Sequence, residues 1–167
     1  MSSQLRQTKQ EKKRLMIEGL RLARNELLQA IQAIPPERLD EIFLGEWSVK
    51  HLVAHLIGWD YTNRQAVEEI LSGQRPSFFQ LYDHDWRSYN ASLVSEYLRE
   101  PFPTLLEAVR DSHQTLIDFL ESLTAKQVME GKAGGGEQGR TVTIRNLLAA
   151  EAKDESLHAM QVRSYFL

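Results

Sequence analysis

The chain has 167 residues, a formal net charge of −3 and no cysteine. This length suits a single domain over residues 1–167, and the weak charge gives no electrostatic reason to expect a nucleic-acid or membrane partner. The lack of cysteine excludes disulfides, thiol nucleophiles and cysteine-ligated zinc. It also favours a reducing compartment. Because the sequence shows no signal-like segment and no apolar run of roughly 18 residues, we expect a cytoplasmic protein.

Helical periodicity dominates the first half of the chain. A first helix is predicted over Gln4–Ala33 and is ended by Pro35 and Pro36, because proline cannot continue a helix. Ser48 is a suitable N-cap for a second helix that runs to about Leu71, where a Ser-Gly pair ends it. The segment between the two helices is predicted to be a connector.

Helical periodicity returns after a loop rich in proline and aromatic residues, over 74–85. A third helix is predicted over Trp86–Leu98, and a fourth starts at Pro103, a favourable first-turn residue. A glycine-rich segment, GKAGGGEQGRTVT, then predicts a flexible crossing, with a short strand or hairpin as one option, before a last helix over Ile144–Phe166. The pattern predicts an all-α bundle of the up-down kind in which the second and last helices face each other.

The last predicted helix carries four ionisable side chains within its apolar face. Glu151, Asp154, Glu155 and His158 fall within about a quarter turn of the centre of that face. The apolar residues that define the face are Ile144, Leu147, Leu148, Val162, Tyr165 and Phe166. Each buried charge costs several kcal/mol unless it is paired or coordinated. We interpret the cluster first as a site; the alternative is a buried network with basic side chains of the first or last helix.

The second helix carries two histidines at a spacing that can serve a metal ion. His51 and His55 stand four residues apart, so both imidazoles can approach one ion. His55 flanks the apolar face beside Trp59 and is either a ligand or a hydrogen-bonded residue at the core edge, whereas His51 points toward solvent. Elsewhere, His113 is interpreted as a satisfied core histidine, and His84 as part of a segment that caps the third helix.

Two pairs on the last helix can chelate a metal. Asp154 and His158 stand four residues apart, and Glu155 and His158 form a Glu-x-x-His pair. Di-iron helical bundles use the Glu-x-x-His element twice, with a further Glu from each remaining helix. This chain contains the element once. A mononuclear site is therefore favoured over a di-iron centre within one subunit.

Two short segments carry a resemblance to a known family. GEWSVKHLVAHLIGWD resembles the opening signature of the DinB/YfiT-like superfamily, in which Trp-Ser precedes a helix that bears a His. DESLHAMQV resembles the family's final-helix His-x-x-x-His-x-x-Gln-Ile element, with His158 at the second His and Gln161 at the Gln. The resemblance implies a DinB-like four-helix bundle with a crossover connection.

The same resemblance implies a divalent metal, often zinc or nickel, held by three side chains. The corresponding residues are His55 and His158, with Asp154 where the family has its middle His. A carboxylate also ligates manganese or iron, so a site of two histidines and one carboxylate remains chemically sound. The substitution equally allows a site that has lost its metal.

From this resemblance we expect a metal-dependent enzyme that acts on a small molecule by thiol S-transfer or hydrolysis. Glu151 or Glu155 would move the proton. One alternative is a non-catalytic, stress-associated protein that binds a metal or small molecule in the same pocket, with a degenerate metal site. Another is an interaction module, whose long basic and apolar first helix would support a homodimer.

Overall fold

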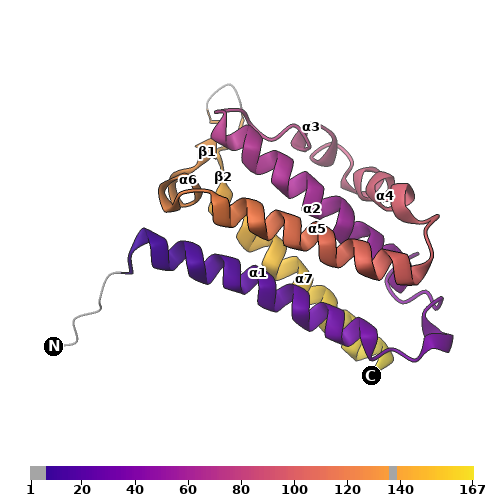
Figure 1. Cartoon of the computed structure of the whole chain (residues 1–167). Coiled ribbons are helices and arrows are strands. Elements are labelled where there is room, and N and C mark those ends of the chain that lie inside the picture. Colours follow the sequence, from indigo (N-terminus) through magenta and orange to yellow (C-terminus); the bar gives the residue numbers. More distant parts are fainter. Residues whose placement is uncertain (1–6, 136–138) are drawn as a thin grey trace.

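The computed structural model describes residues 7–135 and 139–167, and its main feature is a bundle of four long helices (Figure 1). These helices are α1 (Lys9–Gln32), α2 (Val49–Leu71), α5 (Phe102–Ser122) and α7 (Ile144–Phe166). The predicted all-α bundle is confirmed. Among the described residues, no helix combines the length and the apolar composition needed to cross a membrane.

The four helices are arranged as two parallel pairs. α1 packs beside α7 and α2 beside α5, and α2 also contacts α7, as predicted. In Figure 1, α1 and α7 run in one direction along the bundle, while α2 and α5 run in the opposite direction. Parallel neighbours cannot be joined by a short turn, so the chain needs a long crossover between α2 and α5. The predicted crossover is confirmed, whereas the simple up-down order is wrong.

Short elements occupy the connections between the long helices. They are η1 (Pro36–Arg38), α3 (Phe79–Tyr82), α4 (Trp86–Tyr97), α6 (Ala125–Glu130), β1 (Lys132–Ala133) and β2 (Val142–Thr143). α4 packs on α2, while β1 and β2 form an antiparallel ladder before α7. The predicted short strand pairing is thus confirmed, and α6 is an element that the sequence did not predict. Residues 136–138, inside the predicted glycine-rich crossing, lie outside the described part.

N-caps determine where the first two long helices begin. Thr8 forms a capping box with Glu11, so α1 begins at Lys9, whereas the predicted start was Gln4. Residues 1–6 lie outside the described part. Ser48 precedes α2 as predicted, and its backbone N–H donates to Nδ1 of His51 at 3.2 Å. His51 is therefore part of a helix cap.

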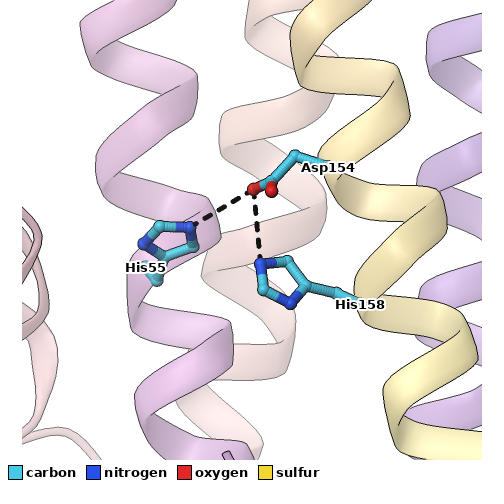
Figure 2. A group of neighbouring side chains, drawn as sticks. All are labelled: His55, Asp154 and His158. Carbon is cyan, nitrogen blue, oxygen red and sulfur yellow. Dashed lines mark ion pairs between the residues drawn. The ribbon is translucent and has the colours of Figure 1, made fainter.

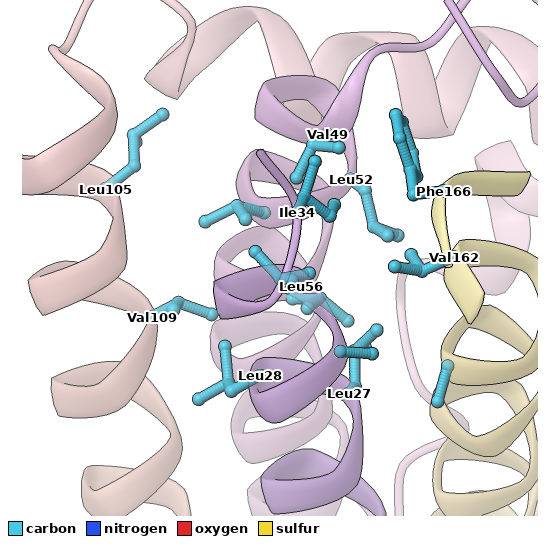
Figure 3. Close-up of a cluster of buried hydrophobic side chains, with 14 of the residues drawn as sticks. Leu27, Leu28, Ile34, Val49, Leu52, Leu56, Leu105, Val109, Val162 and Phe166 are labelled. Carbon is cyan, nitrogen blue, oxygen red and sulfur yellow. The ribbon is translucent and has the colours of Figure 1, made fainter. Parts of the chain in front are cut away.

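The core consists of two apolar clusters that follow one another along the bundle. The first, drawn in Figure 3, joins side chains from all four long helices, including Leu27, Leu56 and Val109. The second includes Leu20 and Leu116. Burying a side chain of this size contributes about 1.5–3 kcal/mol, so the two clusters hold the helices in place around the polar residues that lie between them.

The buried face of α7 differs from the prediction at two positions. Glu151, Glu155 and His158 are buried among the apolar residues, as predicted. Tyr165 is 46% exposed, and the side chain of Asp154 is 50% exposed. Both therefore lie at the edge of the buried face, and Asp154 is accessible from outside the bundle.

Candidate metal centre

Three side chains from α2 and α7 converge in Figure 2. His55 lies on α2, and Asp154 and His158 lie one turn apart on α7. Oδ2 of Asp154 is 3.3 Å from Nε2 of His158 and 3.8 Å from Nε2 of His55. One candidate ligand atom from each residue lies within 4.8 Å of the other two. The structure thus brings together the three residues that the sequence predicts as metal ligands.

His55 is buried between two tryptophan rings. Its ring centroid lies 4.9 Å from that of Trp47 and 6.2 Å from that of Trp59. Burial lowers the pKa of His55 and outweighs the nearby Asp154, which raises it. Nδ1 of His55 has no hydrogen-bond partner among the described residues. His55 therefore presents a neutral ring whose Nε2 faces Asp154.

His158 is oriented by Gln161, about one turn further along α7. Nδ1 of His158 lies 2.7 Å from Oε1 of Gln161. Because an amide oxygen only accepts, the ring donates its Nδ1–H there. Nε2, on the other side of the ring, is left to face Asp154. Metal-ligating histidines are commonly held by a second acceptor in this way, so Gln161 keeps Nε2 directed toward the centre.

The carboxylate of Asp154 supplies a negative charge between the two imidazoles. Burial raises the pKa of Asp154, but the hydrogen bonds from the two histidines outweigh it and hold that pKa below its usual range. Burial lowers the pKa of His158, and the hydrogen bond and charge of Asp154 outweigh it, so the net shift is upward. Two imidazole nitrogens and a carboxylate oxygen form a donor set that zinc, nickel, manganese and iron accept. The residues present therefore fit a divalent metal.

Glu151 lies one turn before Asp154 on α7 and lines the same cleft. Nδ2 of Asn63 donates to its Oε2 at 2.8 Å. Burial, together with the charges of Glu155 and Asp60, raises the pKa of Glu151 to about 8. Glu151 therefore carries a proton at neutral pH and is suited to general acid–base chemistry beside the candidate metal centre.

Glu155 occupies a different environment from Glu151. Its Oε1 and Oε2 accept hydrogen bonds from Arg24 at 2.7 and 2.9 Å. The same guanidinium donates to both oxygens of Asp60, at 2.9 and 3.0 Å. We call these three residues the Arg24 network. Of the two predicted proton carriers, only Glu151 faces the cleft. Glu155 instead belongs to a buried network with an arginine of the first helix, which was the predicted alternative.

The sequence did not predict the partners of the Arg24 network on α2 and α5. Oγ of Ser112 donates to Oδ2 of Asp60 at 2.6 Å, and Nδ1 of His113 lies 3.7 Å from Oδ1 of Asp60. His113 is buried as predicted, but neither of its ring nitrogens has a hydrogen-bond partner among the described residues, so the prediction of a satisfied histidine is wrong. The signal for Asp60 was its place within the apolar face of α2, the same signal that identified Glu151 on α7.

His113, Asp60 and Glu155 also offer ligand atoms within 4.8 Å of one another. The guanidinium of Arg24 already lies between both carboxylates of this second group and donates to all four of their oxygens. The second group is therefore a set of ion pairs and not a metal centre. The exposed His84 lies outside both groups, and its neighbour Asp85 caps α4, as predicted for that segment.

The candidate metal centre opens into a cleft of about 1380 Å³ between α2, α7 and the α3–α4 crossover. Nε1–H of Trp59 donates to Oδ1 of Asn90 at 2.9 Å, which ties α2 to α4. The ring centroids of Phe78, Tyr82 and Tyr89 lie 5.4, 5.7 and 5.7 Å from that of Trp59. Polar groups set against an apolar, aromatic wall are typical of sites that bind small molecules.

Comparisons with known proteins agree with this architecture. A family model described as the DinB superfamily matches residues 20–162. The chain is similar to a solved structure described as YfiT from Bacillus subtilis, a probable metal-dependent hydrolase with an unusual four-helix bundle topology. The TM-score is 0.65 and the identity 17%, over 98% of this chain and 90% of that chain, so the likeness concerns the fold. No curated protein matches the sequence.

Proposed function

The chain belongs to the DinB superfamily, and from this membership we propose that it is a metal-dependent hydrolase of a small molecule. One observation carries the proposal, the convergence of His55, Asp154 and His158 beside a cleft large enough for such a substrate (Figure 2). The description of YfiT as a probable metal-dependent hydrolase supports the reaction class.

His55, Asp154 and His158 would hold the metal, with zinc or nickel expected and manganese or iron as alternatives. A divalent ion supplies a Lewis acid that polarises a substrate group and makes a nucleophile available near neutral pH. Gln161 keeps the ring of His158 turned toward the centre by accepting its Nδ1–H. Trp47 packs against the ring of His55 and restricts its rotation.

Glu151 supplies the proton that hydrolysis requires at the leaving group. Asn63 donates to its Oε2, which leaves Oε1 free to hold the proton. Because burial raises the pKa of Glu151 to about 8, the side chain is a proton donor at neutral pH, and it becomes a base once the proton has left. Thiol S-transfer, the other expected reaction, would also begin with the loss of a proton from the nucleophile, so a protonated Glu151 favours hydrolysis only through its action at the leaving group.

A non-catalytic binding protein is the second candidate. The observation that favours it is the ion pair of Asp154 with His158, whose nearest atoms are 3.3 Å apart. A proton on His158 would satisfy Asp154 without a metal, and the centre would then be degenerate. Small molecules would still enter the cleft in that case, but without turnover.

The two candidates differ in metal-dependent turnover. Chelator-treated protein is reloaded with zinc, nickel, manganese or ferrous iron and assayed on a panel of nitrophenyl esters and amides. We expect turnover that needs the metal, disappears in His158→Ala and falls by about 100-fold or more in kcat for Glu151→Gln. His84→Ala, an exposed residue outside the centre, is the control. Turnover that is equal with and without metal, or equal in wild type and His158→Ala, contradicts the proposal.

A further inference from the structure

The end of the cleft nearest the start of α7 is lined by two arginines. Arg75 follows α2, and Arg140 precedes β2. Asn146, which also lines this end, precedes His158 by 12 residues on one helix. At 1.5 Å per residue, this end therefore lies on the order of 18 Å from the candidate metal centre.

Arg75 is held in place by two neighbours in the α3 segment. Its Nη2 donates to Oδ2 of Asp83 at 2.8 Å, and its guanidinium carbon lies 4.6 Å from the ring centroid of Phe79. Its Nε is buried and has no hydrogen-bond partner among residues 7–135 and 139–167. A buried donor without an acceptor costs free energy until an acceptor reaches it. Arg75 is therefore held in one orientation but still has an unused hydrogen-bond donor.

Glycines bring the segment that carries Arg140 close to Arg75. Gly134 has a φ of +84°, and a Cβ added there would lie 2.8 Å from the carbonyl oxygen of Arg140 and 3.7 Å from Cδ of Arg75. Gly139 has a φ of +80°, and a Cβ added there would lie 3.8 Å from Nε of Arg75. Residues with side chains rarely adopt such φ values, so these glycines allow the approach.

The charges at this end of the cleft are predominantly positive. Among the described residues, the pair of Arg75 with Asp83 is the one ion pair that these two arginines form. Guanidinium groups bind carboxylate and phosphate oxygens through two parallel hydrogen bonds, which makes arginine clusters suited to oxyanions. Between the arginines and the candidate metal centre, Trp59 and Phe78 provide an apolar wall.

We propose that Arg75 and Arg140 form a subsite for the anionic end of an elongated small molecule. The molecule would carry a carboxylate or phosphate at the arginines and an apolar or aromatic middle along Trp59 and Phe78, with its reactive group near His158. This inference rests on the proposed function for the reactive end and names the substrate class of the same cleft. The oxyanion subsite itself needs no metal.

Calorimetric titration of metal-free protein tests the subsite with naphthoate, naphthyl phosphate and the uncharged naphthyl methanol. At least one anion is expected to bind about tenfold more tightly than the alcohol, with an affinity that falls as salt is added. Which anion is preferred distinguishes a carboxylate from a phosphate ligand. Arg140→Met should weaken the anion by about fivefold and leave the alcohol unchanged, because Arg140 is exposed and its loss should not disturb the fold.

Arg110→Met, an exposed arginine outside the cleft, is the matched control and should bind as wild type does. Arg75→Lys keeps the positive charge beside Asp83 and should lose part of the preference for anions. His158→Ala should keep the preference for anions. Failure of the hydrolase proposal would therefore not contradict the subsite, and failure of the subsite would not contradict the hydrolase proposal. Equal affinity for the alcohol and both anions, no measurable binding of either anion, or an unchanged preference in Arg140→Met would overturn the inference.

Discussion

Asp154 determines the charge of the candidate metal centre. Two imidazoles and a carboxylate leave a divalent ion with one net positive charge, whereas three imidazoles leave two. Asp154 is also the most accessible of the three residues, with a side chain 50% exposed against 7% for His55 and 10% for His158. It can therefore serve as a metal ligand or as a rim carboxylate that pairs with a protonated His158, and replacing it separates these two roles.

If Asp154 is a ligand, Asp154→His should retain or tighten zinc binding because it supplies a third imidazole. Asp154→Ala should weaken zinc by at least about 100-fold, since even the loss of an outer partner costs about 10- to 100-fold. Competition titration with a zinc chelator measures both affinities, and Asp111→Ala is an exposed control. If both variants bind zinc as wild type does but unfold more easily, Asp154 is an ion-pair partner and not a ligand.

Glu151 should make the stability of the metal-free protein fall as pH rises. Its pKa is raised from 4.5 to about 8, chiefly by burial, so between these values the folded state binds a proton that the unfolded state has released. Stability decreases with pH wherever the folded state binds more protons. This loss of folding stability is absent below pH 4.5 and complete above about pH 8.

Glu151→Gln removes this titration and keeps an oxygen that can accept from Asn63. We expect the urea-unfolding free energy of wild type to decline more than that of the variant between about pH 5 and about pH 8. The exposed Glu107→Gln should follow wild type. Parallel profiles for wild type and Glu151→Gln would show that Glu151 is ionised in the folded protein near neutral pH.

At the scale of helices, the Arg24 network joins α1, α2 and α7 between the two apolar clusters. Arg24, Asp60 and Glu155 are each 1% exposed. Burial lowers the pKa of Arg24, but the charges of Glu155 and Asp60 and their hydrogen bonds outweigh it and hold the guanidinium charged. The network sets how α2 and α7 face each other, and these two helices carry the candidate metal ligands.

Arg24→Met should destabilise the fold by about 3–5 kcal/mol, because it leaves two carboxylates buried without their cation. Arg21→Met is the matched control on the same helix, since Arg21 forms an exposed pair with Glu121 and should lose no more than about 1 kcal/mol. Urea unfolding monitored by circular dichroism gives both values. Equal stability of the two variants would mean that the buried pairs contribute no more than a surface pair.

Local patterns in the sequence predicted the four long helices, because apolar periodicity and caps depend on neighbouring residues. They did not predict which partner each polar side chain meets. Arg24 and Glu155 are 131 residues apart, so their pairing depends on how the helices assemble. Asp154 and Glu155 are adjacent and both fall near the apolar face of α7, yet one lies at the cleft and the other in the Arg24 network. Spacing on a single helix could not separate them.

At the scale of the whole molecule, the topology creates the cleft. α2 and α5 are parallel, so the chain must travel the length of the bundle between them, and α3 and α4 lie on this crossover (Figure 1). Its aromatic residues Phe78 and Tyr82 then cover Trp59 beside the candidate metal centre. An up-down bundle with short turns would lack this wall. The sequence predicted a crossover only through the family resemblance, because the parallel packing of α2 and α5 has no local signal.

Metal content is the most direct test of the candidate metal centre. The protein is purified without an affinity-metal column and analysed by inductively coupled plasma mass spectrometry beside His158→Ala and His84→Ala. We expect a divalent metal near one equivalent per chain in wild type and in His84→Ala, and a loss of most of that metal in His158→Ala. Metal content that is equal in wild type and His158→Ala, or a wild-type protein that takes up no zinc, nickel, manganese or iron when these are supplied, would contradict a metal centre at His55, Asp154 and His158.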